Sequence, residues 1–238
     1  MTPDELCQLL QSLMQPDTKI VAEATTALKA YFKEVEAVEN LLVLMSQNPN
    51  QQIRQMACVY LRKIAAKLWP NLTADQKATT KQLLLQRFVE EPVTIVKKNI
   101  ADVVGALSII LIPNKEWPEL FQFIFKSTQS DALAEKELAM ILLSVIIEYF
   151  TQAEIEQYYD GLNPIIESYL QSNEPSLRTL SIETVNKLAC TSKAVQVLKK
   201  YNKLIPLVID ALDLSQHLAH GRRSFGAHVG RSTRLLFG

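Results

Sequence analysis

Few side chains in this sequence stand at spacings that catalysis or metal binding would need. The three histidines are His217, His220 and His228, and the first two are three residues apart. That spacing suits two metal ligands, but glycines surround them and no cysteine or carboxylate accompanies them, so no metal site is expected. Glu90 and Glu91 are adjacent, and adjacent helix residues do not face the same reacting atom.

The sequence also lacks the motifs that identify many enzymes. It contains no Gly-x-x-x-x-Gly-Lys loop, Gly-x-Ser-x-Gly turn, His-Glu-x-x-His helix or Gly-x-Gly-x-x-Gly turn. The first 213 residues hold no histidine at all. We therefore expect neither an enzyme nor a cofactor, with a helical enzyme of an uncommon type as the remaining alternative.

The best remaining candidates are polar side chains on two helical faces. Apolar residues recur every three or four positions over 51–69 and over 93–111, which places them on one face of each helix. The polar positions opposite or beside these apolar faces are Gln55, Arg62, Lys63, Lys98 and Asp102. If the two helices pack side by side, the five side chains share one ridge, which either faces water or binds a partner.

Helices of this kind repeat along the chain. The second helix of each pair is apolar and begins near Ile53, Ile95, Leu138 and Leu177, and the first helices of later pairs carry Pro118, Pro164 and Pro206. A period near 40 with two helices per unit is typical of HEAT repeats. One helix pair cannot bury its own apolar face, whereas a stack of pairs forms a continuous core. The pattern predicts an all-α HEAT-repeat solenoid of about five and a half repeats.

The predicted helices can be placed by their apolar periodicity and their start signals. They span 3–14, 17–33, 35–46, 51–69, 74–90, 93–111, 116–126, 133–150, 154–170, 174–190 and about 193–212. Thr73, followed by Gln76 three residues later, predicts a capping box at the start of the fifth helix. The last helix carries an apolar face for which the sequence offers no cover: Leu204, Ile205, Leu207, Val208 and Leu212. Residues 1–213 are thus expected to form the repeats, as a fragment or as a chain whose continuation has been replaced.

Residues 214–238 differ in kind from the rest. They contain four of the six glycines and four arginines without any acidic residue, so we expect a disordered tail. The remaining 213 residues have a net charge of −4, which permits a basic partner and argues against direct binding of nucleic acid. No apolar run reaches the roughly 18 residues of a membrane span, so no membrane contact is expected.

Two further groups of residues are interpreted as structural. Cys7, Cys58 and Cys190 are odd in number and far apart within helical patterns, which favours buried free thiols over disulfides. The aromatic residues over 117–125 suggest core packing, with a pocket for aromatic ligands as the alternative: Trp117, Phe121, Phe123 and Phe125.

The early acidic residues and the lack of a signal peptide favour the cytosol or the nucleus.

One segment carries a specific resemblance. The run Gln-Ile-Arg-Gln-Met-Ala-Cys-Val-Tyr-Leu-Arg-Lys-Ile at 52–64, with Trp69 beyond it, resembles the N-terminal motif of the importin-β family. That motif is an Arg-Gln-x-Ala-x-x-x-Leu-(Lys/Arg) helix that closes near a tryptophan. The flanking sequence agrees with that family: Leu-x-Gln-Leu-Leu at 6–10, then Pro16-Asp17 and an alanine-rich helix over 20–32. Leu-Leu…Pro-Asp-Thr, Gln-Ile-Arg-Gln and Trp-Pro-Glu-Leu-Phe-Gln at 117–122 are most similar to the importin-4 branch. The similar segment covers about 3–213.

The resemblance implies a nuclear transport receptor of the cytoplasm, the nucleus and the nuclear pore. In that family the second-series helices of the N-terminal repeats bind the GTPase Ran in its GTP form. First-series helices bind the phenylalanine-glycine repeats of nucleoporins, and basic cargo such as histones or ribosomal proteins binds mainly to later repeats. The five polar residues of the ridge then become candidates for contacting Ran-GTP.

Two departures from the family limit this reading. Its receptors are several times longer than this chain, and they are typically acidic, whereas this chain is neutral overall. A HEAT-repeat scaffold without Ran dependence and a truncated chain without function are therefore the alternatives.

Overall fold

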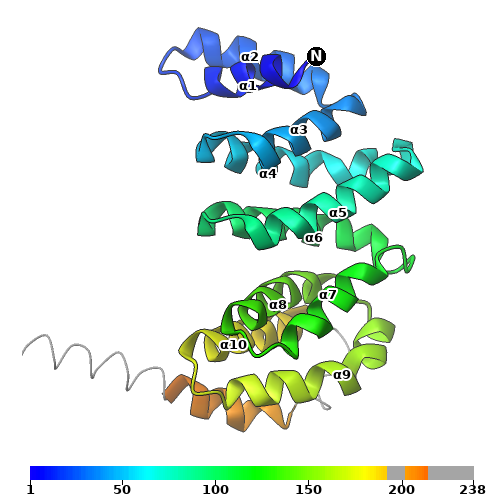
Figure 1. The fold of residues 1–238 in the computed structure, drawn as a ribbon, viewed down its shortest axis with the longest axis vertical. Coiled ribbons are helices and arrows are strands. Elements are labelled where there is room, and N and C mark those ends of the chain that lie inside the picture. The colour runs from blue at the N-terminus through cyan, green and yellow to red at the C-terminus, as the bar shows by residue number, and fades with distance from the viewer. Residues whose placement is uncertain (192–201, 214–238) are drawn as a thin grey trace, which may run out of the picture.

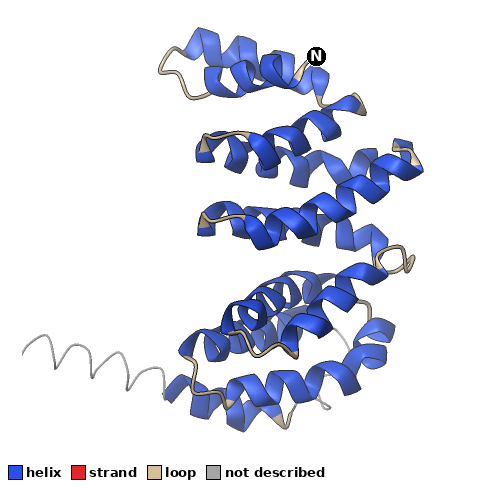
Figure 2. Cartoon of the chain, viewed as in Figure 1, coloured by secondary structure: helices blue, strands red, loops and turns tan. Residues whose placement is uncertain are grey.

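The computed structural model describes residues 1–191 and 202–213. The first range forms α1 (Pro3–Ser12), α2 (Thr18–Tyr31), α3 (Glu36–Gln47), α4 (Gln51–Leu68), η1 (Trp69–Asn71), α5 (Ala74–Glu90), α6 (Thr94–Leu111), α7 (Pro118–Thr128), α8 (Leu133–Ile146), η2 (Ile147–Tyr149), α9 (Gln152–Leu170) and α10 (Pro175–Thr191), where η marks a 3-10 helix. Residues 204–213 are also helical. No strand occurs in the described residues (Figure 2), which confirms the all-α prediction.

The helices stack as antiparallel pairs into an elongated solenoid (Figure 1). The pairs are α1 with α2, α3 with α4, α5 with α6, α7 with α8, and α9 with α10. With the single helix that follows, they correspond to the five and a half repeats that the periodicity predicts. We call α1, α3, α5, α7 and α9 the first-series layer and the other five helices the second-series layer.

The helix ends follow the local signals of the sequence. Thr73 accepts a hydrogen bond from the Gln76 N–H while the Gln76 side chain accepts one from the Thr73 N–H, so the predicted capping box is present. Asp17 caps α2 from outside the helix. Pro118 stands in the first turn of α7, whereas Pro164 lies inside α9. The predicted helix start over 193–201 and the tail 214–238 lie outside the described residues.

From the second repeat onward, the second-series layer is packed more tightly than the first. The pairs α4 with α6, α6 with α8 and α8 with α10 make extensive close contacts, whereas α5 and α7 approach each other less closely than α3 and α5 do. A stack in which one layer is more tightly packed bends toward that layer. The second-series helices therefore lie on the inner side of the curve, and a wider gap separates α5 from α7.

A single hydrophobic core runs along the whole stack. It extends from Leu6 in α1 to Leu204 and Ala211 in the last helix, as a solenoid requires. The expectation that Leu204 lacks cover was wrong, because its side chain is fully buried. Ile205 and Leu212 do remain exposed, at 54% and 44% of their surface.

The cysteines and aromatic residues divide between core and surface. Cys58 is buried, and burial raises the pKa of its thiol to about 12. Cys190 is exposed, so the prediction of a buried thiol was wrong there. Trp117 is 1% exposed, which confirms core packing for this residue, and the partly buried Phe121 stacks on Tyr158 with ring centroids 4.5 Å apart.

One buried ion pair joins two neighbouring repeats. The guanidinium of Arg54 in α4 donates to both carboxylate oxygens of Glu91, at 3.0 and 2.8 Å, just after α5 ends. Burial raises the pKa of Glu91, but the hydrogen bonds from Arg54 and the Val93 N–H, with the charges of Arg54 and Arg87, outweigh it and lower the pKa. Arg54 also donates to the carbonyls of Asn48 and Pro49, so one side chain fixes the turn before α4 and the turn after α5.

One glycine sets the separation of α6 and α8. A Cβ added to Gly105 would lie 2.4 Å from Cγ1 of Val145 and 3.1 Å from a ring carbon of Tyr149. These distances are shorter than van der Waals contact, so the helices pack this closely only because residue 105 lacks a side chain.

We expect Glu91→Gln to lower the free energy of unfolding at pH 7 by about 3–5 kcal/mol, because it leaves the buried guanidinium of Arg54 without its counter-charge. The pKa of Glu91 is lower in the folded chain than the ordinary value of about 4.3. Its contribution to stability is therefore complete above that value and is lost as the pH falls through the lower, folded-state pKa. Urea denaturation from pH 7 to pH 3 would show a weaker acid dependence in the variant. Glu90→Gln is the control, since the Glu90 side chain is 47% exposed, and equal effects of the two variants would contradict the prediction.

We expect Gly105→Ala to destabilise the chain by about 1–3 kcal/mol through overpacking, even though alanine favours helices by about 1 kcal/mol over glycine. Adding Val145→Ala should restore part of the loss, because it removes the atom that the new Cβ meets. Urea denaturation of the single and double variants measures both effects, and a stabilised single variant would contradict the assigned role of Gly105.

Candidate protein-binding site

The predicted ridge forms where α4 lies beside α6. Nη1 of Arg62 donates to Oδ2 of Asp102 at 3.2 Å, and the two side chains are 50% and 41% exposed. This contact brings together two of the five candidate residues from adjacent repeats. The pair is solvated enough for a partner to contact it from outside.

The other three candidates occupy different positions around this pair. Lys98 is exposed on α6 one turn before Asp102, and Gln55 is half-buried on α4 two turns before Arg62. Lys63 is exposed and lies 5.5 Å above the ring of Tyr60, which itself contacts Phe32 after α2. Lys63 thus turns toward α2 and away from the Arg62–Asp102 pair.

The ridge continues into a depression of about 300 Å³ between α6, α8 and α10. Its lining combines the polar side chains of Lys98, Asn99 and Asp102 with apolar ones such as Ile95, which is 49% exposed. A depression with an apolar floor and a charged rim suits a partner segment that inserts an apolar side chain and pairs its charges at the edge.

The far rim of this depression consists of residues that the sequence did not single out. Nζ of Lys187 in α10 lies 3.0 Å from a carboxylate oxygen of Glu148 and 3.5 Å from one of Glu183. Burial lowers the pKa of Lys187, but the hydrogen bond and the charge of Glu148, with those of Glu183, outweigh it and raise the pKa.

The repeat spacing could have located part of this lining. Ile141 and Val145 of α8 follow Lys98 and Asp102 by one spacing of 43 residues, and all four line the depression. The ion pairs of Lys187 carry no such signal, because they depend on how α10 is placed against η2.

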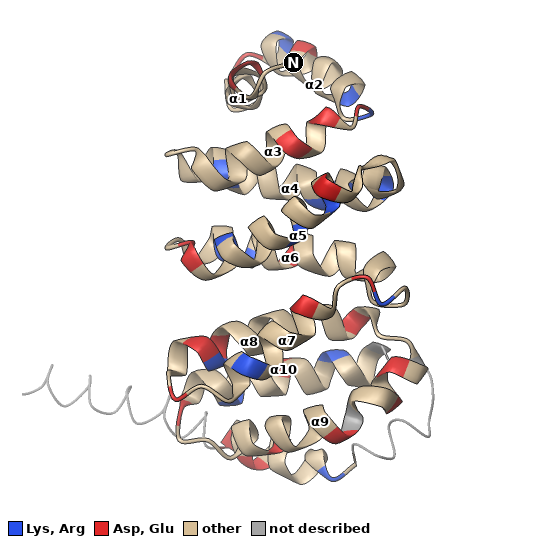
Figure 3. Ribbon diagram, turned by 45° about the vertical axis from the view of Figure 1, so that its right-hand side comes forward, with Lys and Arg blue, Asp and Glu red and all other residues tan. Residues whose placement is uncertain are grey.

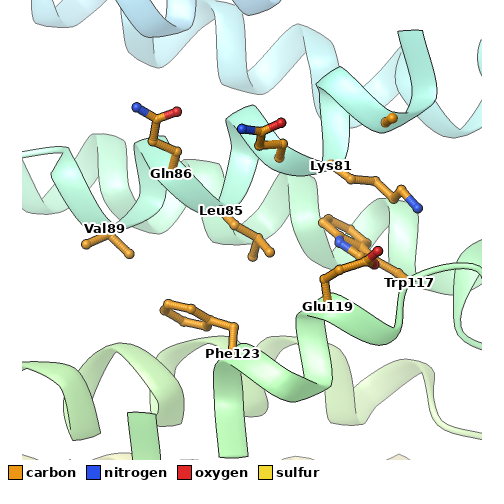
Figure 4. Close-up of a pocket in the computed structure, with 9 residues that line it drawn as sticks. Lys81, Leu85, Gln86, Val89, Trp117, Glu119 and Phe123 are labelled. Atoms are coloured by element: carbon orange, nitrogen blue, oxygen red, sulfur yellow. The ribbon is translucent and has the colours of Figure 1, made fainter. Parts of the chain in front are cut away.

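A second hollow lies on the other layer, in the gap between α5 and α7. It has a volume of about 560 Å³ and is mainly apolar. Figure 4 shows Leu85 and Val89 reaching down from α5 and Phe123 reaching up from α7, with the indole of Trp117 at the end near Lys81. The core prediction for the aromatic group of 117–125 is confirmed for Trp117, which is 1% exposed and borders the groove only at its end. Phe121 and Phe123 are partly buried against the core, and Phe123 lines the groove.

Other kinds of site would need a patch of one charge, a cluster of metal ligands or a long apolar helix. Figure 3 shows acidic and basic residues interspersed over the helices, without one long stretch of a single sign. Within the described ranges, no group of three or more metal-binding side chains occurs, and no helix is long and apolar enough to cross a membrane. The histidines considered for a metal site lie outside those ranges.

An elongated α-solenoid with a polar ridge on its inner layer and an apolar groove on its outer layer belongs to the class of helical-repeat proteins. Comparison with known families narrows this class. Residues 24–90 match the importin-beta N-terminal domain, and residues 92–220 match the family described as IPO5-like, TPR repeats. The chain belongs to the importin-β family.

Individual relatives agree with this assignment. The chain is 34% identical over 145 residues to the probable importin subunit beta-4 of Schizosaccharomyces pombe, covering 60% of this chain and 14% of that protein. It is 27% identical over 216 residues to importin-4 of Mus musculus, covering 89% of this chain and 19% of that one. The chain thus spans less than a fifth of the length of these two relatives.

Solved structures share the fold. Kap121p bound to RanGTP superposes with a TM-score of 0.71 at 18% identity, over 92% of this chain and 20% of that one. Kap95 in its complex with Nup1 gives 0.72 at 19% identity, over 88% and 27%. The importin-β family consists of transport receptors rather than enzymes, which confirms the expectation of a non-enzymatic protein.

We expect the Arg62–Asp102 pair to contribute little to stability, because it is half exposed. Arg62→Ala and Asp102→Ala should each change the free energy of unfolding by less than about 1 kcal/mol in urea denaturation. A loss of several kcal/mol would mean that the pair holds α4 and α6 together and does not serve mainly as a contact surface.

Proposed function

We propose that this chain is the N-terminal part of a nuclear transport receptor and that its inner layer binds Ran in the GTP-bound form. The observation that carries this proposal is the ridge formed by α4 and α6, where Arg62 meets Asp102 and Lys98 stands beside them. The ridge lies on helices that extend from the segment matching the importin-beta N-terminal domain into the next repeat. Kap121p, which shares this fold, has been solved bound to RanGTP.

The chemistry of the ridge suits a GTPase surface. Its charged groups are mostly basic, with Arg62 and Lys63 on α4 and Lys98 on α6, so they can pair with acidic side chains of a partner. The switch segments of small GTPases are ordered by the γ-phosphate and its magnesium ion and are released on hydrolysis. A rigid surface that contacts those segments therefore distinguishes the GTP form from the GDP form. In this proposal Gln55 extends the contact along α4, and Lys63 extends it toward α2.

A second contact is proposed for the groove between α5 and α7, which would hold phenylalanine-glycine segments of nucleoporins. The supporting observation is the apolar lining by Leu85, Val89 and Phe123. Such a lining buries an aromatic side chain favourably. Kap95, another protein of this fold, has been solved with Nup1.

Cargo and location complete the proposal. The net charge of −4 over residues 1–213 favours basic cargo such as histones or ribosomal proteins, with most of its contacts on later repeats of a longer receptor. Ran-GTP and cargo would compete, and because binding coupling is reciprocal each would lower the affinity for the other by the same factor. A receptor of this kind moves between cytoplasm and nucleus through the nuclear pore.

The test is a calorimetric titration of the full chain with Ran loaded with a non-hydrolysable GTP analogue or with GDP. We expect binding to the GTP form, and at least a tenfold weaker affinity for Arg62→Glu/Lys98→Glu, which corresponds to about 1.4 kcal/mol. Lys115→Glu/Lys126→Glu makes the same change of charge at exposed positions around α7 and should bind as the unmodified chain does.

The possible outcomes separate the alternatives. Equal affinity for both nucleotide states, or none for a folded and monodisperse chain, would favour a scaffold without Ran dependence or a chain without function. Unchanged affinity of Arg62→Glu/Lys98→Glu would place the Ran contact elsewhere on the solenoid.

A further inference from the structure

The groove between α5 and α7 has the features of a binding site with an unfilled hydrogen-bond position. Val89 is 43% exposed at its edge although it is apolar. The side chain of Trp117 is 1% exposed, and its Nε1–H has no acceptor within the described part of the chain. Buried indole N–H groups usually have a partner. The groove therefore suits a segment that brings an apolar side chain and a carbonyl oxygen.

The sequence of the chain contains a segment with the matching chemistry. Of its eight phenylalanines, only Phe225 and Phe237 are followed by glycine, and both lie in the tail 214–238. Arg223 stands two residues before Phe225, and Arg234 stands three before Phe237. The tail thus contains two copies of a basic residue followed closely by Phe-Gly.

The spacing of these residues fits the groove. Glu119 and Phe123 both line the groove and are one turn apart on α7, a rise of roughly 6 Å. Two or three residues of extended chain span roughly 7–10 Å. An extended segment can therefore place a phenylalanine against Phe123 and Val89 while its arginine reaches the carboxylate of Glu119. The glycine after each phenylalanine lets the backbone approach the groove closely.

The charge and the reach of the tail are also compatible with this site. The tail carries four arginines and no acidic residue, whereas residues 1–213 carry a net charge of −4. Phe225 follows residue 213 by 12 residues, which can span roughly 40 Å. Neighbouring packed helices are roughly 8–10 Å apart. The gap between the third and fourth repeats therefore lies within this span of the last helix, which belongs to the sixth repeat.

We propose that the groove between α5 and α7 binds an extended basic segment bearing Phe-Gly, and that its occupant in this chain is the chain's own tail around Phe225 or Phe237. This inference uses the groove of the proposed nucleoporin contact, but it requires no Ran binding. The tail blocks the groove to other Phe-Gly segments and makes access to it dependent on release of the tail.

Cross-linking in the full chain tests the occupant directly. A photoreactive benzoylphenylalanine replaces Phe225 in one sample and Phe237 in another, and mass spectrometry maps the linked residues after illumination. We expect at least one of the two samples to link mainly to α5 or α7 within a single chain, with a yield independent of protein concentration. Val89→Gln/Glu119→Lys should reduce that yield at least fivefold, because it removes apolar surface and reverses the charge that faces the arginine.

Controls make the result specific. Both groove positions are exposed, so circular dichroism should show an unchanged helix content in Val89→Gln/Glu119→Lys. The matched control is Lys115→Glu/Lys126→Glu, which should leave the yield unchanged. Links to other helices, links that depend on concentration, or an equal yield in the groove variant would overturn the proposal.

A second measurement separates this inference from the nucleoporin contact. A fluorescent peptide with repeated Phe-Gly is titrated against the full chain and against Phe225→Ser/Phe237→Ser. We expect at least a fivefold tighter affinity for the tail variant, and Leu235→Ser/Leu236→Ser should not reproduce that gain. Equal peptide affinity for the tail variant and the unmodified chain would overturn the tail as occupant. If neither chain binds the peptide, only the cross-link decides between the tail in the groove and an empty groove.

Discussion

The fold depends on one constraint: a single helix pair of this chain cannot bury its own apolar face. Each pair buries that face against the next, which is why one core runs from Leu6 to Ala211. The buried ion pair of Arg54 and Glu91 orients two neighbouring repeats relative to each other, because it joins the turn before α4 to the turn after α5. Apolar contacts bring the repeats together, and this ion pair fixes how two of them are aligned.

Both candidate sites arise from the unequal packing of the two layers. On the inner side, α4 and α6 lie close enough for Arg62 and Asp102, 40 residues apart in sequence, to form an ion pair. On the outer side, the same curvature leaves α5 and α7 further apart, and the gap is lined by apolar side chains. A polar contact surface and an apolar groove are thus two results of one bend.

The sequence was sufficient for the fold because periodicity and caps are local signals. It predicted α5 with the observed bounds of Ala74–Glu90, and the two stripes that meet at Arg62 and Asp102. It missed what depends on the packing of distant segments. Glu91 looked like half of an acidic pair at a helix end, whereas it is the buried partner of Arg54, 37 residues earlier. The burial of Leu204 and the exposure of Cys190 could not be read from periodicity for the same reason.

The two sites are close neighbours in the architecture, since α5 contributes to the groove and α6, its partner in the same repeat, contributes to the ridge. Gly105 lets α6 approach α8 closely, so the curvature of the inner layer depends on contacts with almost no free space. A ligand that changes the separation of α5 and α7 would have to change the angle between these repeats, because packed helices do not deform continuously. Any partner of the inner ridge whose affinity depends on that angle is then coupled to the occupant of the outer groove. Such coupling is reciprocal, so each ligand would alter the affinity of the other by the same factor.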